Sequence, residues 1–348
     1  DLGPRPFIAF APRVVRQDKP AVQAQAVGCL TRARPGREDG LGGGAGGRYG
    51  GRGGGKGIAM ARFGEAPSGT RSWLLQQQSA DGSLPDAAGN ADLEGTALLM
   101  LSLLGDGNTL RGGPFTEPLS RGIGWLLDQQ DDDGRFGQRG PDEVRLHALA
   151  TYVMAEAFGL SIAWPLRPAL QDGLAWLGAH RQADGGFGDG TTSDCMSTAT
   201  ALMALASAEF FAQEPPARPA EVIAWFDTQP AADKLTTAET AATLFCRFFA
   251  GQEPKSTPSM VAAAKLLGAK ARTDEPWEAY WTSYALFQVG GGDWKAWSKR
   301  LQGIADARLT DGEFAGSWEP AGGHSRIVTG ALRLLSLQAY YRYTKLVR

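Results

Sequence analysis

Four polar side chains of this sequence are suited to acid–base chemistry because they stand in or beside apolar stretches. His147 lies within RLHALATYVMAEAF, where an imidazole facing a cavity could transfer protons. Glu94, Asp194 and Glu239 lie at or near the starts of apolar segments that are predicted to be helices. We take these four as candidate catalytic residues. The alternatives are structural: a hydrogen-bonded core histidine, and carboxylates that cap helix N-termini.

A second set of side chains could bind a ligand. Tyr280, Trp281 and Tyr284 form an aromatic cluster, and such rings either stabilise a carbocation through their faces or line a dry pocket. His324 and Arg326 stand near the start of the last predicted helix, where an arginine opposes the helix dipole. Arg326 is therefore expected to pair with a carboxylate or to bind an anion. These five are the candidate ligand-binding residues.

Helix-pair repeats must hold these residues in place. Trp73, Trp125 and Trp176 recur about every 50 residues, a period typical of repeat architectures. A glycine that can take the positive φ angle of a helix C-terminus follows nine residues after each of them (Gly82, Gly134 and Gly185). A weaker copy of the unit surrounds Trp225. The spacing therefore predicts repeated helix–turn–helix units.

Six such units fill the chain from residue 58 onward, with degenerate copies at 258–276 and 297–318. In each unit an amphipathic helix precedes a more apolar helix that should be buried. Six buried and six outer helices would close into a double ring, and closure removes exposed repeat ends. The predicted fold is an all-α α/α toroid (an α6–α6 barrel) whose inner-helix N-termini surround one mouth. One central pocket is then expected to receive four side chains: His147, Asp194, Tyr280 and Arg326.

Length and charge narrow the function classes. The 348 residues carry a net charge of −2, so nothing favours nucleic acid or an anionic membrane surface as a partner. Residues 1–57 are predicted to be an extension with a glycine-rich linker over 36–57, and 58–348 to be the toroid. The linker arginines could also suit RNA, but a solvated tether is favoured. Because the chain begins with Asp1, a signal peptide or membrane anchor could precede it.

The repeat RGIGWLLDQQDDDGRF resembles the QW motif of squalene–hopene and oxidosqualene cyclases. Its matching residues are Arg121, Gly122, Trp125, Leu126, Gln130 and Gly134, with Phe136 in place of the final tryptophan. In this motif the glutamine amide is expected to bond free backbone groups at a helix end. The motif therefore indicates the fold rather than a reaction.

Three longer stretches resemble the bacterial prenyltransferase/squalene-oxidase-repeat proteins, a branch of the terpenoid-cyclase-like toroids. The stretches cover 145–159, 280–297 and 316–343. Such proteins often carry a glycine-rich linker ahead of the repeats, behind a membrane segment. The resemblance implies a protein of the cell envelope, periplasmic or membrane-tethered through an N-terminal anchor.

The chemistry of the related families is only partly represented in this sequence. Squalene–hopene cyclases protonate an alkene with an acid in an Asp-x-Asp-Asp motif, which is absent here. Prenyltransferase β subunits bind zinc through Asp, Cys and His. Here Asp194 and Cys195 are adjacent, whereas the family has one residue between them, and His324 lies on the opposite side of the predicted ring. We therefore predict no metal and no other cofactor.

The predicted function is binding of an apolar or isoprenoid-like ligand, or of a peptide, in the central cavity without turnover. One alternative is a terpene cyclase or prenyltransferase-type enzyme that uses a different acid. Another is a carbohydrate-active α/α barrel, in which two inner carboxylates would flank the scissile bond. An apolar and aromatic lining would favour the isoprenoid, whereas paired acids would favour the sugar.

Overall fold

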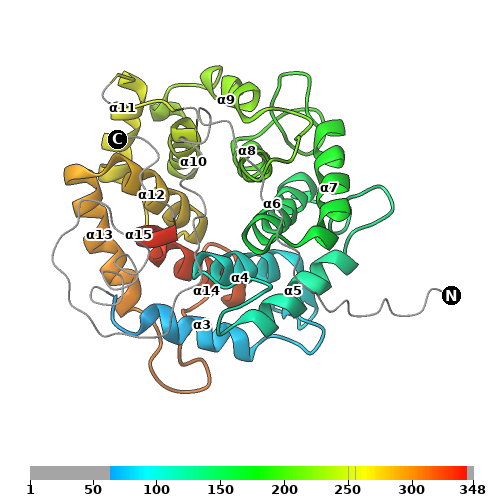
Figure 1. Cartoon of the computed structure of the whole chain (residues 1–348). Coiled ribbons are helices and arrows are strands. Elements are labelled where there is room, and N and C mark those ends of the chain that lie inside the picture. Colours follow the sequence, from blue (N-terminus) through cyan, green and yellow to red (C-terminus); the bar gives the residue numbers. More distant parts are fainter. Residues whose placement is uncertain (1–62, 250, 255, 343–348) are drawn as a thin grey trace.

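The computed structural model describes residues 63–249, 251–254 and 256–342, and these form a double ring of helices (Figure 1). The predicted extension and linker over 1–57 lie outside the described residues. The predicted all-α toroid is confirmed. In the described part of the chain, no helix is both long enough and apolar enough to cross a membrane.

Six helices make up the inner ring. They are α4 (Leu93–Gly105), α6 (Glu143–Ser161), α8 (Cys195–Phe210), α10 (Thr237–Phe249), α12 (Pro276–Val289) and α14 (Arg326–Leu337). Each packs against the next in chain order, and α14 packs back against α4, so the ring is closed (Figure 1). Since the helices between them run in the opposite direction, the inner-helix N-termini meet at one mouth.

Six further helices surround this ring. They are α3 (Ala66–Gln76), α5 (Thr116–Asp128), α7 (Arg167–Ala179), α9 (Pro219–Asp227), α11 (Pro258–Lys270) and α13 (Gly291–Asp306). The smaller elements are two 3-10 turns (Trp164–Leu166 and Ala232–Lys234), α15 (Ala339–Arg342) and the antiparallel pair β1 (Leu84–Pro85) and β2 (Ala91–Asp92), in which Leu84 pairs with Asp92.

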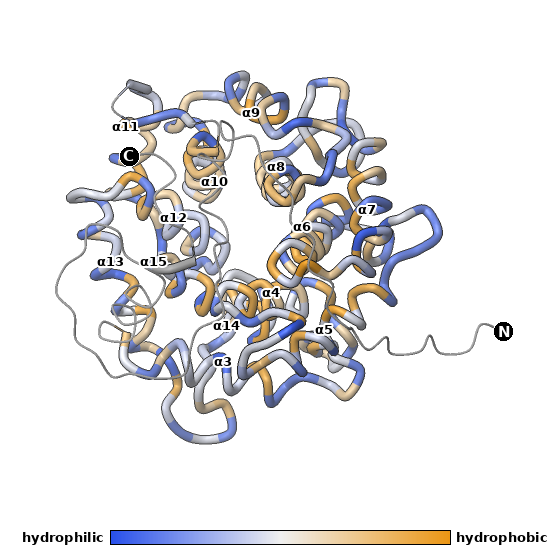
Figure 2. The backbone as a smooth tube through the Cα atoms, viewed as in Figure 1, coloured by the Kyte–Doolittle hydropathy of each residue, from blue (hydrophilic) through white to orange (hydrophobic). Residues whose placement is uncertain are grey.

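Hydrophobicity decides which helices lie inside. Positions 95–104 of α4 and 147–158 of α6 are buried without a break, because these helices are apolar on every side. Figure 2 shows the apolar residues gathered on the inner helices. Helix α5 is amphipathic and buries Leu119, Ile123 and Leu126 against the ring. The predicted division into buried and outer helices is confirmed.

The repeated tryptophans occupy equivalent places in the outer helices. Trp73, Trp125 and Trp176 each lie three residues before the end of α3, α5 and α7, and each is buried. The glycine of the following turn has a φ angle of 100°, 87° and 94° in the three units. The sequence period therefore corresponds to one structural unit, as predicted.

A side-chain amide ties each turn to the next outer helix. Gln130 Nε2 donates to the carbonyl of Gly134 in its own turn (2.9 Å) and to that of Ala169 in α7 (2.8 Å). Gln78 makes the corresponding pair of bonds one unit earlier, at 2.9 and 3.0 Å. These bonds satisfy carbonyl groups near helix termini, which otherwise lack partners. The glutamine therefore connects neighbouring units.

Candidate functional site

Charged and aromatic side chains from three inner helices meet at the mouth of the ring. Glu94 Oε1 accepts hydrogen bonds from the Arg145 guanidinium (2.7 Å) and from the Trp277 indole N–H (3.1 Å). The Arg145 guanidinium also lies 5.3 Å from the centre of the Trp277 ring, within cation–π range. Glu94 comes from α4, Arg145 from α6 and Trp277 from α12, so closure of the ring positions them.

A second ion pair extends this group. His324 Nε2, just before α14, lies 3.5 Å from Glu275 Oε1, which stands at the N-cap of α12. The hydrogen bond to Glu275 raises the pKa of His324 above its ordinary value. Burial acts to raise the pKa of Glu275, but the bonds from His324 and from the first turn of α12 lower it overall. We call Glu94, Arg145, Glu275, Trp277 and His324 the mouth cluster.

The His324–Glu275 pair gives a first prediction. Glu275→Gln is expected to lower the pKa of His324 toward its ordinary value, because the amide keeps the shape of the side chain but not its charge. His324 gains its partner only on folding, so its stabilising contribution is complete at low pH and is lost as the pH rises through the raised pKa. NMR titration of the imidazole protons measures the His324 pKa in the wild type and in Glu275→Gln. An unchanged His324 pKa in Glu275→Gln would contradict the pairing.

Acids at the starts of three inner helices take part in local hydrogen bonding. The Asp92 carboxylate accepts two N–H bonds from the first turn of α4, at 2.9 and 3.2 Å, and burial raises its pKa. Asp194 accepts two from the first turn of α8, at 2.9 and 2.8 Å. Glu239 bonds the backbone N–H and the hydroxyl of Thr236, each at 2.8 Å. The structure thus gives each of these acids a capping contact.

His147 does not face the centre of the ring, so that expectation is wrong. Its Nδ1 accepts the N–H of Phe136 (2.9 Å), and its Nε2 therefore donates to the carbonyl of Gly173 in α7 (2.9 Å). The side chain is 0% exposed, and burial lowers its pKa to about 3. Thr96 and Thr198 make the corresponding bond to the turn in the units on either side. Both ring nitrogens are therefore used for structure.

Arg326 also points away from the centre. Its guanidinium donates to the carbonyl of Trp318 (2.8 Å) and to the Glu319 carboxylate (2.8 Å), and it lies 4.1 Å from the centre of the Phe314 ring. The arginine does pair with a carboxylate. However, its partners belong to the loop before α14 and none of them contacts Asp194. The expectation of one pocket shared by His147, Asp194, Tyr280 and Arg326 is therefore wrong.

The aromatic residues of α12 lie close together. Ring centres are 5.0 Å apart for Tyr280 and Trp281, and 4.9 Å apart for Tyr280 and Tyr284. Trp277 of the mouth cluster lies 6.3 Å from Trp281, and Phe245 of α10 lies 6.1 Å from it. All five rings are buried, so they form a continuous aromatic face.

This face is turned toward the middle of the ring. Ser283 accepts the indole N–H of Trp297 from the outer helix α13 (3.0 Å), which marks the outer side of α12. At 3.6 residues per turn, Trp281 lies almost opposite Ser283, and Trp277 and Tyr284 both lie on one side of Trp281, where the Tyr284 hydroxyl donates to the carbonyl of Leu335 in α14 (2.9 Å). The aromatic face thus begins at the mouth and continues inward.

The three residues compared with a zinc site, Asp194, Cys195 and His324, have separate structural roles. Cys195 is buried at the start of α8, and burial raises the pKa of its thiol to about 12, which keeps it protonated. Asp194 caps the same helix, whereas His324 pairs with Glu275. Within the described ranges, no three His, Cys, Asp or Glu side chains are placed to hold a metal ion.

Sequence reasoning identified Glu94 and His324 but missed three members of the mouth cluster. Arg145, Glu275 and Trp277 stand in the first turn or at the N-cap of apolar helices. A charged or aromatic residue at that place in each inner helix was the available signal. Only the order of helices around the ring shows which of them meet.

The chain shares its fold with several solved structures. An inactive variant of an α-1,6-mannanase from Salegentibacter sp. HEL1_6, bound to α-1,6-mannotetrose, has a TM-score of 0.62 at 11% identity, covering 80% of this chain and 98% of that one. A variant of the type II terpene cyclase MstE from Scytonema, bound to geranylgeranyl dihydroxybenzoate, gives 0.59 at 16% identity, with 82% and 98% covered.

An unsaturated glucuronyl hydrolase specific for heparin is similar at the same level, with a TM-score of 0.58, 11% identity and coverage of 81% and 97%. No protein-family model matches the chain, and no curated protein matches it. The molecule is therefore an α/α toroid, a fold that these glycoside-processing enzymes and the terpene cyclase share. At such identities the likeness defines the fold and leaves the ligand open.

Proposed function

We propose that the toroid binds an elongated apolar ligand of the isoprenoid type, with the polar end of the ligand at the mouth cluster. The observation that carries this proposal is the aromatic face of α12 and α10. It starts at Trp277, in contact with Glu94 and Arg145, and continues inward through Trp281. Such a face offers a large apolar contact area directly below a charged rim.

The neighbouring inner helices also place apolar side chains toward the centre, and the buried Glu156 of α6 lies among them, where its carboxylate accepts the hydroxyl of Ser207 in α8 (2.9 Å). On α6, Leu149 lies across the helix from His147, which contacts α7. On α8, Met203 lies across the helix from Thr198, which bonds the outer turn. Both are buried, so a ligand must separate packed side chains as it enters. Burial of apolar area on the ligand then drives binding.

The mouth cluster suits a hydroxyl or anionic end group. Arg145 and His324 supply N–H donors there, and each is held in place by a carboxylate, Glu94 or Glu275. Oriented donors at the rim of an apolar site fix the direction in which an amphiphilic ligand enters. An isoprenol or an isoprenoid acid has this combination of one polar end and a long apolar chain.

Binding without turnover is proposed because protonation of an alkene needs a carboxylic acid that is neutral and ready to donate. Burial raises the pKa of Asp92 at the mouth of the described part of the ring. Its carboxylate accepts two backbone N–H bonds, which favour the charged form. Glu94 is held by Arg145.

The second candidate is a carbohydrate-active barrel. The observation that favours it is the same Trp277, since an indole next to a carboxylate and an arginine also suits a sugar ring. Two of the similar structures act on glycans by their names, a mannanase and a glucuronyl hydrolase. This candidate requires two carboxylates free to flank a glycosidic bond.

Binding of geranylgeraniol and of α-1,6-mannotetraose to the full chain separates the two candidates. We expect geranylgeraniol to quench tryptophan fluorescence at saturation, and Trp277→Leu to weaken its binding about tenfold, because a large ring contact is lost. Trp164→Leu is the matched control, since Trp164 is 59% exposed and follows the C-terminal end of α6, whereas Arg145 of the mouth cluster lies in the first turn of that helix.

Three results would count against this proposal. Equal affinity of wild type and Trp277→Leu for geranylgeraniol would show that the mouth cluster is not part of the binding site. Binding of the tetrasaccharide alone, lost in Trp277→Leu, would replace the isoprenoid with the sugar. Binding of neither probe to the wild type would overturn both candidates and leave only the fold.

A further inference from the structure

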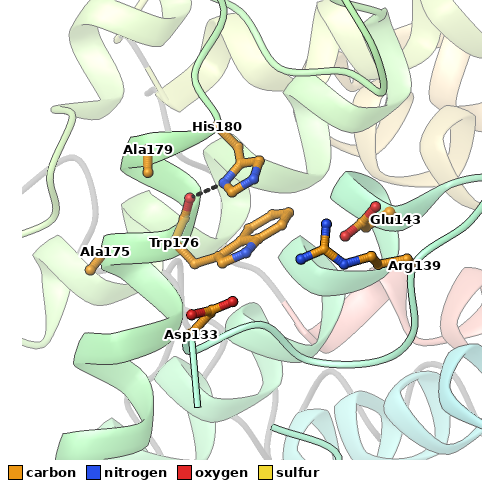
Figure 3. Close-up of a pocket in the computed structure, with 7 residues that line it drawn as sticks. All are labelled: Asp133, Arg139, Glu143, Ala175, Trp176, Ala179 and His180. Carbon is orange, nitrogen blue, oxygen red and sulfur yellow. Dashed lines mark hydrogen bonds between the residues drawn. The ribbon is translucent and has the colours of Figure 1, made fainter. Parts of the chain in front are cut away.

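An open pocket of about 330 Å³ lies outside the inner ring, between the C-terminal end of α7 and the loop that leads into α6 (Figure 3). Seven residues line it: Asp133, Arg139, Glu143, Ala175, Trp176, Ala179 and His180. This pocket is separate from the mouth cluster. Glu143 faces it, whereas Arg145 of the same helix turns inward to Glu94.

An indole–imidazole stack forms one wall. The Trp176 and His180 rings lie 3.5 Å apart between centres with an interplanar angle of 15°. His180 Nδ1 donates to the carbonyl of Trp176 (2.8 Å), so Nε2 of the neutral ring remains an acceptor. Figure 3 shows Asp133, Arg139 and Glu143 around the indole, with His180 stacked against it. Aromatic surface and polar groups of both kinds therefore meet here.

In the next unit of the toroid, the residues at the corresponding positions are hydrogen-bonded to each other. There, Trp225 donates its indole N–H to the Asp184 carboxylate at 3.0 Å, and Ser193 donates to the same carboxylate at 2.5 Å. Asp133 and Trp176 occupy the corresponding places one unit earlier. Neither side chain makes a hydrogen bond to another described residue, and both line the open pocket. Their polar groups are thus available to a ligand.

We propose that this pocket binds a neutral sugar ring. A pyranose has a face of C–H groups that packs on an aromatic ring, and its hydroxyls both donate and accept. The pocket supplies the exposed ring of His180, which is stacked on the buried Trp176, together with a donor on Arg139 and acceptors on Asp133 and His180. Its volume is at the lower end of the range for small-molecule sites, about 300 to 1,000 Å³, which suits one or two rings.

The charges around the pocket favour a neutral ligand over an ion. Asp133 and Glu143 would repel an anion, whereas Arg139 would repel a cation. Glu143 is already paired with Arg135 at 2.9 Å, so its carboxylate is oriented before any ligand arrives. Charged side chains that offset one another are strong hydrogen-bond partners for hydroxyl groups.

Single substitutions on the exposed loop test the proposal without disturbing the core. Binding of D-mannose, D-glucose and D-galactose to the full chain is measured by saturation-transfer NMR and calorimetry. We expect at least one hexose to bind the wild type. Asp133→Ala and Arg139→Ala should each weaken that binding about tenfold, the effect of losing one charge-assisted hydrogen bond. Asp132→Ala is the matched control, an exposed neighbour of Asp133 that does not line the pocket.

The outcomes are distinct from those for the mouth cluster. Trp277→Leu should leave hexose binding unchanged, and Asp133→Ala should leave geranylgeraniol binding unchanged, so either proposal can fail alone. Absence of binding for all three hexoses at tens of millimolar would overturn the pocket proposal. Hexose binding that survives the double variant Asp133→Ala/Arg139→Ala with wild-type affinity would overturn it as well.

Discussion

Replacing His147 with alanine is expected to lower the free energy of unfolding by about 4 kcal/mol at neutral pH. The imidazole is fully buried and bonds the N–H of Phe136 and the carbonyl of Gly173. Alanine would leave both backbone groups without partners and would create a cavity between α6 and α7. Each of these losses is destabilising.

The same histidine should make the wild type sensitive to acid. Burial lowers the pKa of His147 to about 3 in the folded protein, whereas the unfolded chain takes up the proton near the ordinary value of 6.5. Below pH 6.5 the unfolded state therefore binds more protons, and stability falls by about 1.4 kcal/mol per pH unit until the folded pKa is reached. A chain without His147 lacks this contribution, so its deficit should shrink as the pH falls.

Urea unfolding of wild type and His147→Ala at pH 7 and pH 4.5 measures both effects. His147→Thr is the informative companion, because Thr96 and Thr198 accept the turn N–H at the corresponding positions. Threonine should recover about 1 kcal/mol of the loss, the worth of one buried hydrogen bond. A stability difference between wild type and alanine variant that stays constant from pH 7 to pH 4.5 would contradict a neutral, buried His147.

The fold was predictable because the same helix-and-turn pattern recurs along the sequence. Trp125 and Gly134 recur with the same spacing as Trp73 and Gly82, and each pair marks the end of an outer helix and the turn after it. The inner helices could be recognised because they are apolar on every side. Periodic features of this kind depend on local spacing, which a single sequence displays fully.

The orientation of inner-helix side chains could not be predicted in the same way. In a helix that is apolar all round, the sequence does not distinguish the face toward the outer helices from the face toward the centre. The sequence around His147 therefore does not show that this side chain faces α7. Alignment of the units would have helped, because Thr96 and Thr198 at the same place are small hydrogen-bonding residues.

Contacts between distant units were equally hidden. Trp277 and Glu94 are 183 residues apart in sequence and meet only because the ring closes between α14 and α4. The outer pocket shows a further limit. The Asp133–Trp176 and Asp184–Trp225 pairs have the same residue types, yet only the second pair is hydrogen-bonded. The same two residue types at corresponding repeat positions can therefore either bond each other or line a pocket.

The turn glycines provide a final, larger test of how the units are joined. Gly134→Ala is expected to cost at least about 3 kcal/mol, whereas Gly185→Ala should cost about 1 to 2 kcal/mol. Both glycines have positive φ angles, 87° and 94°, so both substitutions bring backbone strain. A Cβ on Gly134 would also lie 2.6 Å from the backbone oxygen of Asp172 in α7, whereas on Gly185 its nearest neighbour is the flexible Arg181 side chain at 3.4 Å.

The difference between the two variants isolates the contact between a turn and the next outer helix. Arginine can move aside at Gly185, but the backbone of α7 can yield at Gly134 only if the whole helix shifts away from the turn. Such a shift would also lengthen the bond from Gln130 to Ala169, so that loss should appear in the same variant. Thermal and urea unfolding of the two variants give the comparison, and equal destabilisation would show that strain in φ alone accounts for both.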